Sequence, residues 1–403
     1  MTSKERMLTA MRNKVPDRVP VCPDISNMIP CVLTGKPFWE IYVFEDPPLG
    51  KAYLETIRIL NMDGWYIYEN ITGGNKNFPL DKKLTTKIIY NSILVPEEIV
   101  TKKIVFKDDE KLKQQTIIET PYGNLEQTSV FFRNAPPWKE TNYIKNIETD
   151  WKKMKWILGD EWHWNNKIED LELVGDSGVH SISILSFVDF WDAIRSGGSE
   201  RVIYDFFDFP KTMENIFNFY KEFAIQQTIA AIKSGTDEIL LQGSTSSLSL
   251  INPAIYDRFI LPLNKKIAEI CKKENVISHL HICGKSKYAV KKNIENTYID
   301  VYEPLEKPPN GDIDIVEIKR KYGKKVALKG NILTTGVLAH GTPDDVKKEV
   351  IETLKNAAEN GGFILSTGDQ VGGNTPIDNL KTLIETGQKY GEYTKEGKLK
   401  VFT

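Results

Sequence analysis

The residue types best suited to chemistry occur together in one short segment, HLHICG (279–284). Side chains of a strand alternate between its two faces, so His279, His281 and Cys283 would share one face. In a parallel barrel strand that face points inward, and Cys283 would lie at the carboxyl end, where such barrels place their chemistry. Imidazole and thiolate are both zinc ligands, so this spacing is compatible with a zinc site. The alternative is a buried cysteine that fills core space beside a hydrogen-bonded histidine.

Two carboxylates follow other predicted strands and are candidates for the same site. Asp369 comes at the end of the last predicted strand, where an oxygen ligand could complete a three-ligand zinc site and leave the fourth position open for substrate. Glu303 follows the apolar run NTYIDVYE and is a candidate general acid or base, or a ligand. The alternatives are that Asp369 caps a turn and that Glu303 is a surface carboxylate before the loop KPPN (307–310).

Further polar and aromatic side chains are placed to line such a site. Gln242 and Ser244 end the segment EILLQGS (238–244), and we predict that they bind substrate or cofactor through neutral hydrogen bonds. Asp24 follows the first predicted strand and is a further candidate catalytic carboxylate. Three aromatic residues flank the turn NAPP and could form a lid over a flat substrate or cofactor ring, with packing of a hairpin as the simpler explanation: Phe131, Phe132 and Trp138.

A scaffold of alternating strands and helices must position these residues, and the second half of the chain predicts one. Five short, mainly apolar segments are typical of strands: 178–186, 238–244, 276–284, 326–332 and 362–368. Between them, apolar residues recur with a helical period over 213–231 and 344–360. Thr342-Pro343 and Thr375-Pro376 supply helix starts. Strands that alternate with helices indicate a parallel sheet.

The first half of the chain is less regular. Residues 3–12 are expected to form a helix, and 18–21 and 64–70 the first two strands. Residues 80–150 are rich in lysine, and a central Pro-Tyr-Gly-Asn turn predicts a β-hairpin within 116–133.

We interpret 80–150 as an insertion, so that residues 1–403 form a single domain. A doubly wound open sheet is the alternative fold, but no glycine-rich dinucleotide loop follows any predicted strand.

Composition narrows the class of protein. The formal net charge of −2 favours neither nucleic acid nor an anionic membrane as a partner, and no uncharged run reaches the ~18 residues of a membrane span. The first 20 residues contain no continuous apolar segment, so no secretory signal is expected. Four widely spaced cysteines make a disulfide framework improbable, and we expect a cytoplasmic protein.

Several segments, in the same order along most of the chain, resemble the uroporphyrinogen decarboxylase-like superfamily. They are SKERMLTAMRNKVPDRVPV, PYGNLEQ with APPW, HICG, VALKGNI, GTPDDV and STGDQVGGNTPIDNL. The resemblance implies an α/β fold, a (β/α)8 TIM barrel, here with a β-hairpin insertion in the N-terminal half. Decarboxylases of the superfamily carry an arginine-rich loop after the first strand, whereas PDISNMIPCVLTGKP at this place contains no arginine.

The methyltransferase branch of the superfamily carries a His-x-Cys zinc motif and a second cysteine near the end of the last strand. His281 and Cys283 match the motif, and Asp369 stands where the second cysteine is expected. The resemblance therefore implies a corrinoid-dependent methyltransferase with zinc at His281, Cys283 and Asp369. A site with one thiolate and a carboxylate is harder than one with two thiolates.

Because no built-in cobalamin loop is recognisable, we expect a separate corrinoid protein to supply the cobalamin. The predicted reaction is demethylation of a small methyl donor, best a methoxylated aromatic, with transfer of the methyl group to Co(I). The alternatives are a methylcobamide:thiol (coenzyme M) methyltransferase, a uroporphyrinogen decarboxylase and a non-catalytic tetrapyrrole-binding barrel. A homo-oligomer is compatible with the sequence.

Overall fold

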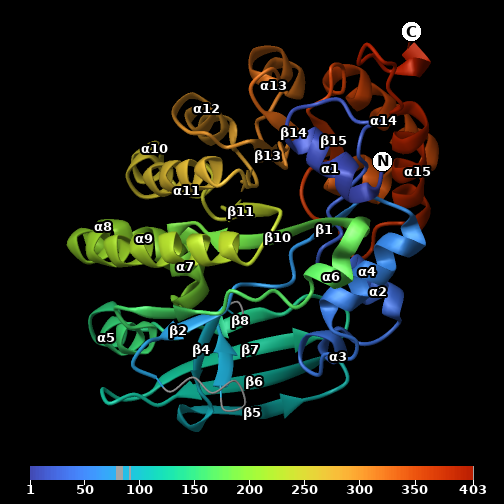
Figure 1. The fold of residues 1–403 in the computed structure, drawn as a ribbon. Coiled ribbons are helices and arrows are strands. Elements are labelled where there is room, and N and C mark those ends of the chain that lie inside the picture. Colours follow the sequence, from blue (N-terminus) through green and yellow to red (C-terminus); the bar gives the residue numbers. More distant parts are fainter. Residues whose placement is uncertain (79–84, 90–91, 403) are drawn as a thin grey trace.

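The computed structural model describes residues 1–78, 85–89 and 92–402, and its central element is a parallel sheet of seven strands (Figure 1). In sheet order these are β1 (Gly64–Tyr66), β10 (Gly178–Leu185), β11 (Glu238–Gln242), β12 (Ile277–His281), β13 (Val301–Glu303), β14 (Ala327–Ile332) and β15 (Phe363–Thr367). From β10 onward, sheet neighbours follow one another along the chain with helices between them. The five strands predicted in the second half are therefore confirmed, each slightly shorter than its sequence segment.

The sheet is strongly curled. Lys329 of β14 lies with its Nζ 3.2 Å from the ring centroid of Trp65 in β1, although four strands separate β1 from β14 in the sheet order. In a flat sheet with strands about 4.8 Å apart, these side chains could not meet. The inner face of the curl is therefore a shared interior to which distant strands contribute.

The predicted first strand, residues 18–21, does not form a regular strand. Val21 instead makes an isolated parallel bridge to Leu365 of β15. The amide of Cys22 donates to the Leu365 carbonyl at 2.8 Å, and the amide of Asp63 donates to the Val21 carbonyl at 2.9 Å. This extended segment thus contacts both β15 and the residue before β1. The predicted second strand is confirmed only over Gly64–Tyr66.

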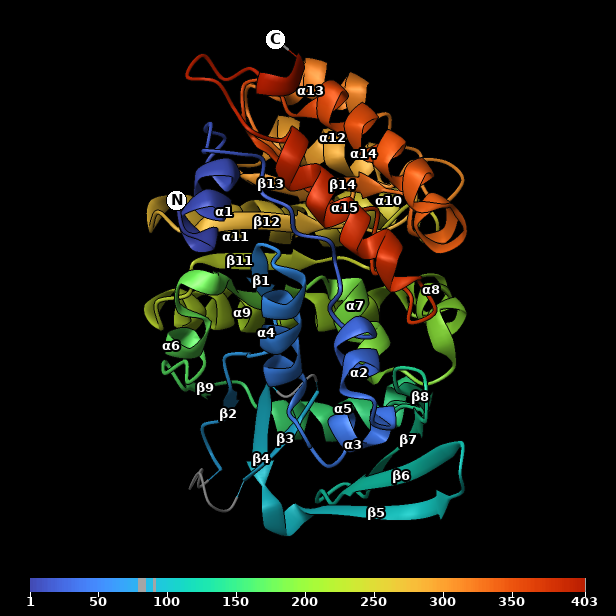
Figure 2. The same cartoon turned by 90° about the vertical axis from the view of Figure 1, so that its right-hand side faces the viewer.

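Helices cover the outer side of the sheet (Figures 1 and 2). Helix α1 (Ser3–Met11) precedes the extended segment 18–21. The helices that follow the strands of the sheet from β10 onward are α7 (Phe187–Ile194), α8 (Gly198–Asp208), α9 (Pro210–Lys233), α10 (Pro253–Ile255), α11 (Leu261–Lys273), α12 (Lys287–Asn296), α13 (Ile315–Tyr322), α14 (Pro343–Ala357) and α15 (Ile377–Tyr390). The remaining helices are α2 (Ile29–Thr34), α3 (Phe38–Tyr42), α4 (Leu49–Leu60), α5 (Ile147–Leu158) and α6 (Leu171–Val174). Thr342 caps α14 as predicted, because its hydroxyl accepts from the Asp345 amide. In the described part of the chain, no helix is long and apolar enough to cross a membrane.

Two small sheets form the excursion in the N-terminal half, at the lower end of Figure 1. One contains β3 (Thr85–Ile88), β4 (Ile93–Pro96), β2 (Gly73–Asn75) and β9 (Trp162–Trp164), and the other contains β5 (Val100–Lys107), β6 (Lys111–Ile118), β7 (Leu125–Phe132) and β8 (Trp138–Thr141). The predicted hairpin is β6–β7, with Ile118 opposite Leu125. The excursion is larger than one hairpin, and positions 80–84 and 90–91 of the predicted insertion lie outside the described residues.

The parallel register brings the chemistry-bearing residues to one edge of the sheet. His281 is the last residue of β12 and is paired with Gln242, the last of β11, and with Glu303, the last of β13. Thr367 ends β15, two residues before Asp369. The carboxyl ends of parallel strands lie at the same edge, so all four segments deliver side chains to one place.

Candidate active site at the carboxyl ends of the strands

Three possible metal ligands meet at the carboxyl edge of the sheet. The Nε2 of His281 lies 3.0 Å from Cys283 Sγ and 3.9 Å from an oxygen of Asp369. The three ligand atoms all lie within 4.8 Å of one another. The sequence-based grouping of these residues is therefore matched by their positions, although β12 ends at His281 and Cys283 lies in the loop after it.

Backbone geometry presents the side chains of Cys283 and Asp369. Gly284 has φ +71°, which lets the chain turn sharply after Cys283, and an added Cβ there would lie 2.5 Å from Ser249 Oγ. Asp369 has φ +85°, a region that residues with a side chain seldom adopt and that Asp and Asn tolerate best. Backbone conformations of this kind persist where the surrounding structure enforces them, often at functional sites.

Glu303 lies behind His281, on the far side from Cys283. The Nδ1–H of His281 donates to Glu303 Oε1 at 2.9 Å, because a carboxylate can only accept. In the neutral imidazole this bond selects the tautomer in which Nε2 carries no proton and faces Cys283 and Asp369. The arrangement is the carboxylate–histidine pairing that commonly orients a metal-binding imidazole. Glu303 is thus placed to position His281.

Glu303 also contacts a fully buried network of charged groups inside the curled sheet. Lys329 forms an ion pair with Glu303, and both side chains are buried. Glu303 Oε2 also lies 3.7 Å from His279 Nε2, and the Nδ1 of His279 lies 3.4 Å from Glu238. The indole Nε1 of Trp65 donates to Glu238 at 2.5 Å. His279 therefore belongs to this network, and its side chain lies beneath the three-ligand cluster.

Burial and neighbouring charges shift the pKa values of this group. Burial alone would raise the pKa of Glu303, but Lys329, His279 and His281 hold it well below its ordinary value. Burial would lower the pKa of His281, yet Cys283 and Glu303 raise it well above its ordinary value. Burial raises the pKa of the Cys283 thiol to about 11, against the lowering effect of His281. Without a metal, the Cys283 thiol therefore holds its proton at neutral pH, and the protonated form of His281 is favoured.

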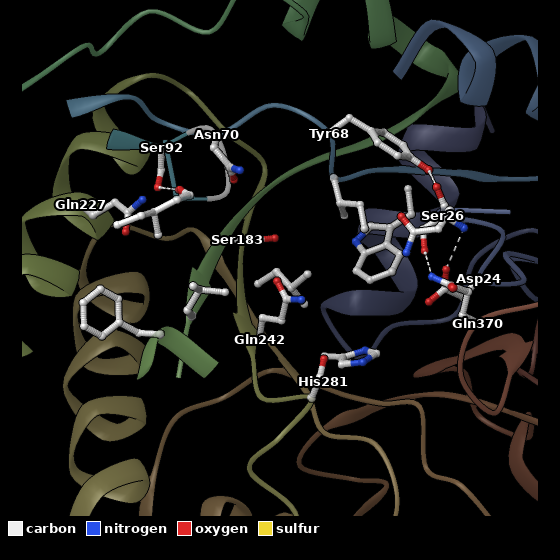
Figure 3. Close-up of a pocket in the computed structure, with 18 of the residues that line it drawn as sticks. Asp24, Ser26, Tyr68, Asn70, Ser92, Ser183, Gln227, Gln242, His281 and Gln370 are labelled. Carbon is white, nitrogen blue, oxygen red and sulfur yellow. Dashed lines mark hydrogen bonds between the residues drawn. The ribbon is translucent and has the colours of Figure 1, made fainter. Parts of the chain in front are cut away.

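A pocket of about 310 Å³ adjoins the cluster and is shown in Figure 3. His281 and Asp369 lie in its wall, together with the predicted residues Asp24, Gln242 and Ser244. Sequence reasoning missed other lining residues, among them Trp65, Tyr68, Phe190, Tyr220, Phe223, Ser183, Gln227 and Gln370. Asp24 accepts from the Ser26 amide at 3.0 Å, and burial raises its pKa despite the opposing effect of Lys329. The volume is at the lower end of the range for small-molecule sites.

The aromatic residues predicted to form a lid do not contribute to this pocket. Phe131 and Phe132 lie in β7 and Trp138 in β8, and none of the three lines the cavity. Trp138 is 56% exposed. The lid hypothesis is therefore wrong for this pocket, because these three residues belong to strands β7 and β8 of the inserted sheet and do not reach the pocket. The aromatic wall of the pocket comes instead from β1, α7 and α9.

Comparison with known proteins connects this geometry to a family. Residues 192–390 match the family model described as Uroporphyrinogen decarboxylase (URO-D). The Methylcobamide:CoM methyltransferase MtbA of Methanosarcina mazei is 24% identical over 399 residues, which cover 96% of this chain and 98% of the relative. The Uroporphyrinogen decarboxylase of Synechocystis is 24% identical over 139 residues, 34% of this chain and 37% of that relative.

A solved structure described as a methyltransferase from Methanosarcina mazei has the same overall fold. Its TM-score is 0.63 at 18% sequence identity, and the match covers 97% of this chain and 99% of that one. The resemblance first noted in short sequence motifs is thus supported over the full length. Residues 192–390 thus resemble the uroporphyrinogen decarboxylase family, and over its full length the chain is similar to proteins named methylcobamide:CoM methyltransferases.

Proposed function

We propose that this chain is a zinc-dependent methyltransferase that moves a methyl group between the corrinoid of a partner protein and a small substrate held in the 310 Å³ pocket. The observation that carries the proposal is the cluster of His281, Cys283 and Asp369, of which His281 and Asp369 line that pocket. By name, the full-length relatives act on a methylcobamide and coenzyme M. We therefore favour a thiol as the methyl acceptor.

The ligand set fits zinc. Zinc accepts imidazole nitrogen, thiolate sulfur and carboxylate oxygen, and a tetrahedral site places its ligand atoms about 3.5 Å apart. The separations of 3.0 Å and 3.9 Å from His281 Nε2 to Cys283 and Asp369 bracket that value. Glu303 supplies the outer hydrogen bond that such a histidine usually makes. Three protein ligands leave one position for substrate on the side of the pocket.

In this mechanism the protein binds the thiol, removes its proton and excludes water. The bound zinc would act as a Lewis acid that stabilises the thiolate. We assign Asp24 as the group that takes up the thiol proton, because it lines the pocket and burial raises its pKa. The sulfur–carbon bond then forms as the cobalt–carbon bond breaks, and the electron pair of that bond remains on cobalt as Co(I). The aromatic wall keeps the reacting atoms dry.

Demethylation of a methoxylated aromatic remains the second candidate. The observation in its favour is the aromatic lining of the pocket, including Trp65 and Tyr68, which suits a flat ring. In this direction the methyl group would pass from the ether oxygen to Co(I), and the phenolate would need charge stabilisation.

One experiment separates the two reactions and tests the proposal. Purified protein, loaded with zinc, is mixed with methylcobalamin and small thiols, and the methylcobalamin-to-Co(I) spectral change is followed. We expect methylation of a thiol at a rate well above the uncatalysed reaction. In the reverse format, a reduced corrinoid protein is offered methoxylated aromatics, and methyl-Co(III) formation there would select demethylation. A metal-free protein with no turnover in either format would contradict the proposal and favour the non-catalytic alternative.

Zinc affinity should increase with pH across the neutral range. The pKa of Cys283 is about 11 without metal and that of His281 is well above its ordinary value, so zinc must displace a proton from each. Lowering the pH therefore favours the protonated, metal-free form. Calorimetric titration in buffers with different ionisation enthalpies would count the protons released. Affinity that is independent of pH between 6 and 8 would contradict the assignment of these ligands.

We also propose that residues 19–22 close the curled sheet into an eight-stranded (β/α)8 barrel, and that the chain forms one domain with the two small sheets as insertions. The hydrogen bonds from this segment to β15 and to Asp63 support the closure.

A further inference from the structure

The part of the pocket away from the metal ligands is built from neutral polar groups. Gln227 of α9, Gln242 of β11 and Ser183 of β10 all line it. In Figure 3, Gln227 and His281 lie on opposite sides of the pocket, with Ser183 and Gln242 between them. A substrate whose reacting atom is at the cluster could therefore extend a second group toward Gln227.

Gln227 is the most informative of these residues. Gln227 is only 5% exposed overall, and its amide group, which none of the described residues partners through a hydrogen bond, opens onto the pocket. A ligand that fills the pocket would cover this amide, and covering it without a hydrogen-bond partner would be costly. Gln227 also lies among the mainly apolar buried residues of α9. The amide is therefore placed to form its hydrogen bond with a ligand in the pocket.

An aromatic surface forms part of the surroundings of Gln227. Phe190 and Tyr220 are stacked with ring centroids 4.2 Å apart, and Phe223 also lines the pocket. The hydroxyl of Tyr220 donates to the Leu185 carbonyl at 2.7 Å and so is already used. This end of the pocket therefore offers an aromatic surface together with neutral polar side chains, among them the Gln227 amide, which both donates and accepts, with Asn70 and Ser92 beside it in Figure 3.

Charge in the pocket disfavours an anionic substrate tail. Among the described residues that line it there is no lysine or arginine, and the ionisable groups, Asp24, Asp369 and His281, lie on the side of the metal ligands, away from Gln227. Lys329 is near Trp65 but is ion-paired with Glu303 on the inner side of the curl. A sulfonate or carboxylate tail would thus be desolvated without a cationic partner in this part of the chain.

We infer that Gln227 is a specificity-determining residue that selects an uncharged substrate with an amide or similar neutral polar group, in preference to an anionic thiol such as coenzyme M. This inference rests on the proposed function and names its substrate class. In the reaction, the neutral thiol loses its proton, its sulfur bonds to the methyl carbon and the cobalt–carbon bond breaks with both electrons on cobalt.

The test compares three thiols with methylcobalamin as the methyl donor. N-acetylcysteamine is neutral and carries an amide, 2-mercaptoethanesulfonate is anionic and cysteamine is cationic. We expect kcat/KM for N-acetylcysteamine to exceed that for each of the others by at least about tenfold, the effect of one well-made hydrogen bond. Preference for the sulfonate or for cysteamine would overturn the inference and leave the methyltransferase proposal intact.

A substitution then assigns the selectivity to Gln227. Gln227→Met keeps the shape of the side chain and should lower kcat/KM for N-acetylcysteamine about tenfold, with little change for the sulfonate. Gln226→Met, at the exposed neighbouring position of α9, is the matched control and should behave as wild type. If Gln227→Met does not fold, Gln227→Asn, which withdraws the amide by one methylene, takes its place. Unchanged selectivity in the folded variant would overturn the inference.

Binding separates this inference from the proposed function. Calorimetry with the same three thiols and the zinc-loaded protein, without corrinoid, measures selectivity independently of turnover. Selective binding of N-acetylcysteamine that depends on Gln227, with no methylation of any thiol, would support the inference and contradict the thiol reaction. Equal binding of all three thiols would overturn the inference.

Discussion

Replacement of His281 or Cys283 by alanine is expected to remove the bound zinc and to lower kcat/KM for methyl transfer by about 10³-fold or more. Each change removes one of three ligands, and loss of the ion removes several kcal/mol of charge stabilisation. The fold should persist, because a chain of 403 residues buries a large core and does not depend on a structural ion. Elemental analysis, circular dichroism and the methylcobalamin assay measure the three consequences.

The matched control is His163→Ala, which removes an exposed histidine of β9 that is not part of the cluster. It should keep both zinc and activity. Asp369→Cys would convert the ligand set to one nitrogen and two sulfurs, and we expect it to retain zinc, whereas Asp369→Ala should weaken zinc binding. Stoichiometric zinc in both His281→Ala and Cys283→Ala would mean that the metal binds elsewhere in the protein.

The three-ligand cluster was predictable because it depends on local rules. Alternation of side chains along a strand places His281 and Cys283 on one face, and the parallel arrangement brings Asp369 to the same edge. Asp24, Gln242 and Ser244 were predicted by the same argument, and all three line the pocket. Their roles in binding or catalysis remain proposals.

The supporting network and the far wall of the pocket depend on contacts between distant strands, which periodicity does not specify. Lys329 meets Trp65 only because the sheet curls. A signal was nevertheless present, since a lysine within the apolar strand VALKGNI must find a buried partner. Gln227 gave a similar signal, as an amide in line with the apolar residues of 213–231. The aromatic lid was a wrong prediction. The alternation of apolar and polar residues within the insertion predicts its strands, but it does not predict where the insertion lies relative to the main sheet.

Glu303→Gln is expected to destabilise the protein by about 3–5 kcal/mol, the usual effect of leaving one member of a buried ion pair without its partner. Lys329 is fully buried and pairs with Glu303. The substitution therefore leaves the Lys329 ammonium group beside the Trp65 ring without its carboxylate partner. Deprotonation of Lys329 limits the loss, because shifting a lysine from its ordinary pKa of about 10.4 to 7 costs about 4–5 kcal/mol. Thermal or denaturant unfolding of the zinc-free proteins measures the change.

The pH dependence of this variant has a definite sign. In the wild type, Glu303 has a pKa below its ordinary value, so its stabilising effect is present above the ordinary pKa of a glutamate and is lost as the pH falls. In Glu303→Gln, Lys329 should have a lowered pKa in the folded state, and the unfolded state then binds more protons between that pKa and about 10. The stability deficit of the variant should therefore shrink as the pH rises from 7 to 10. A deficit that is constant over this range would show that Lys329 does not carry the cost.

A double variant separates stability from metal binding. Glu303→Gln combined with Lys329→Met removes both charges and should recover most of the lost stability, since the penalty comes from an unpaired buried charge rather than from loss of the pair. Zinc affinity should not recover to the same extent, because a neutral amide is a weaker acceptor than a carboxylate for the Nδ1–H of His281. We expect affinity to remain about 10–100-fold below wild type. Recovery of both properties together would mean that Glu303 acts only on stability, whereas recovery of stability alone would assign to Glu303 the positioning of His281.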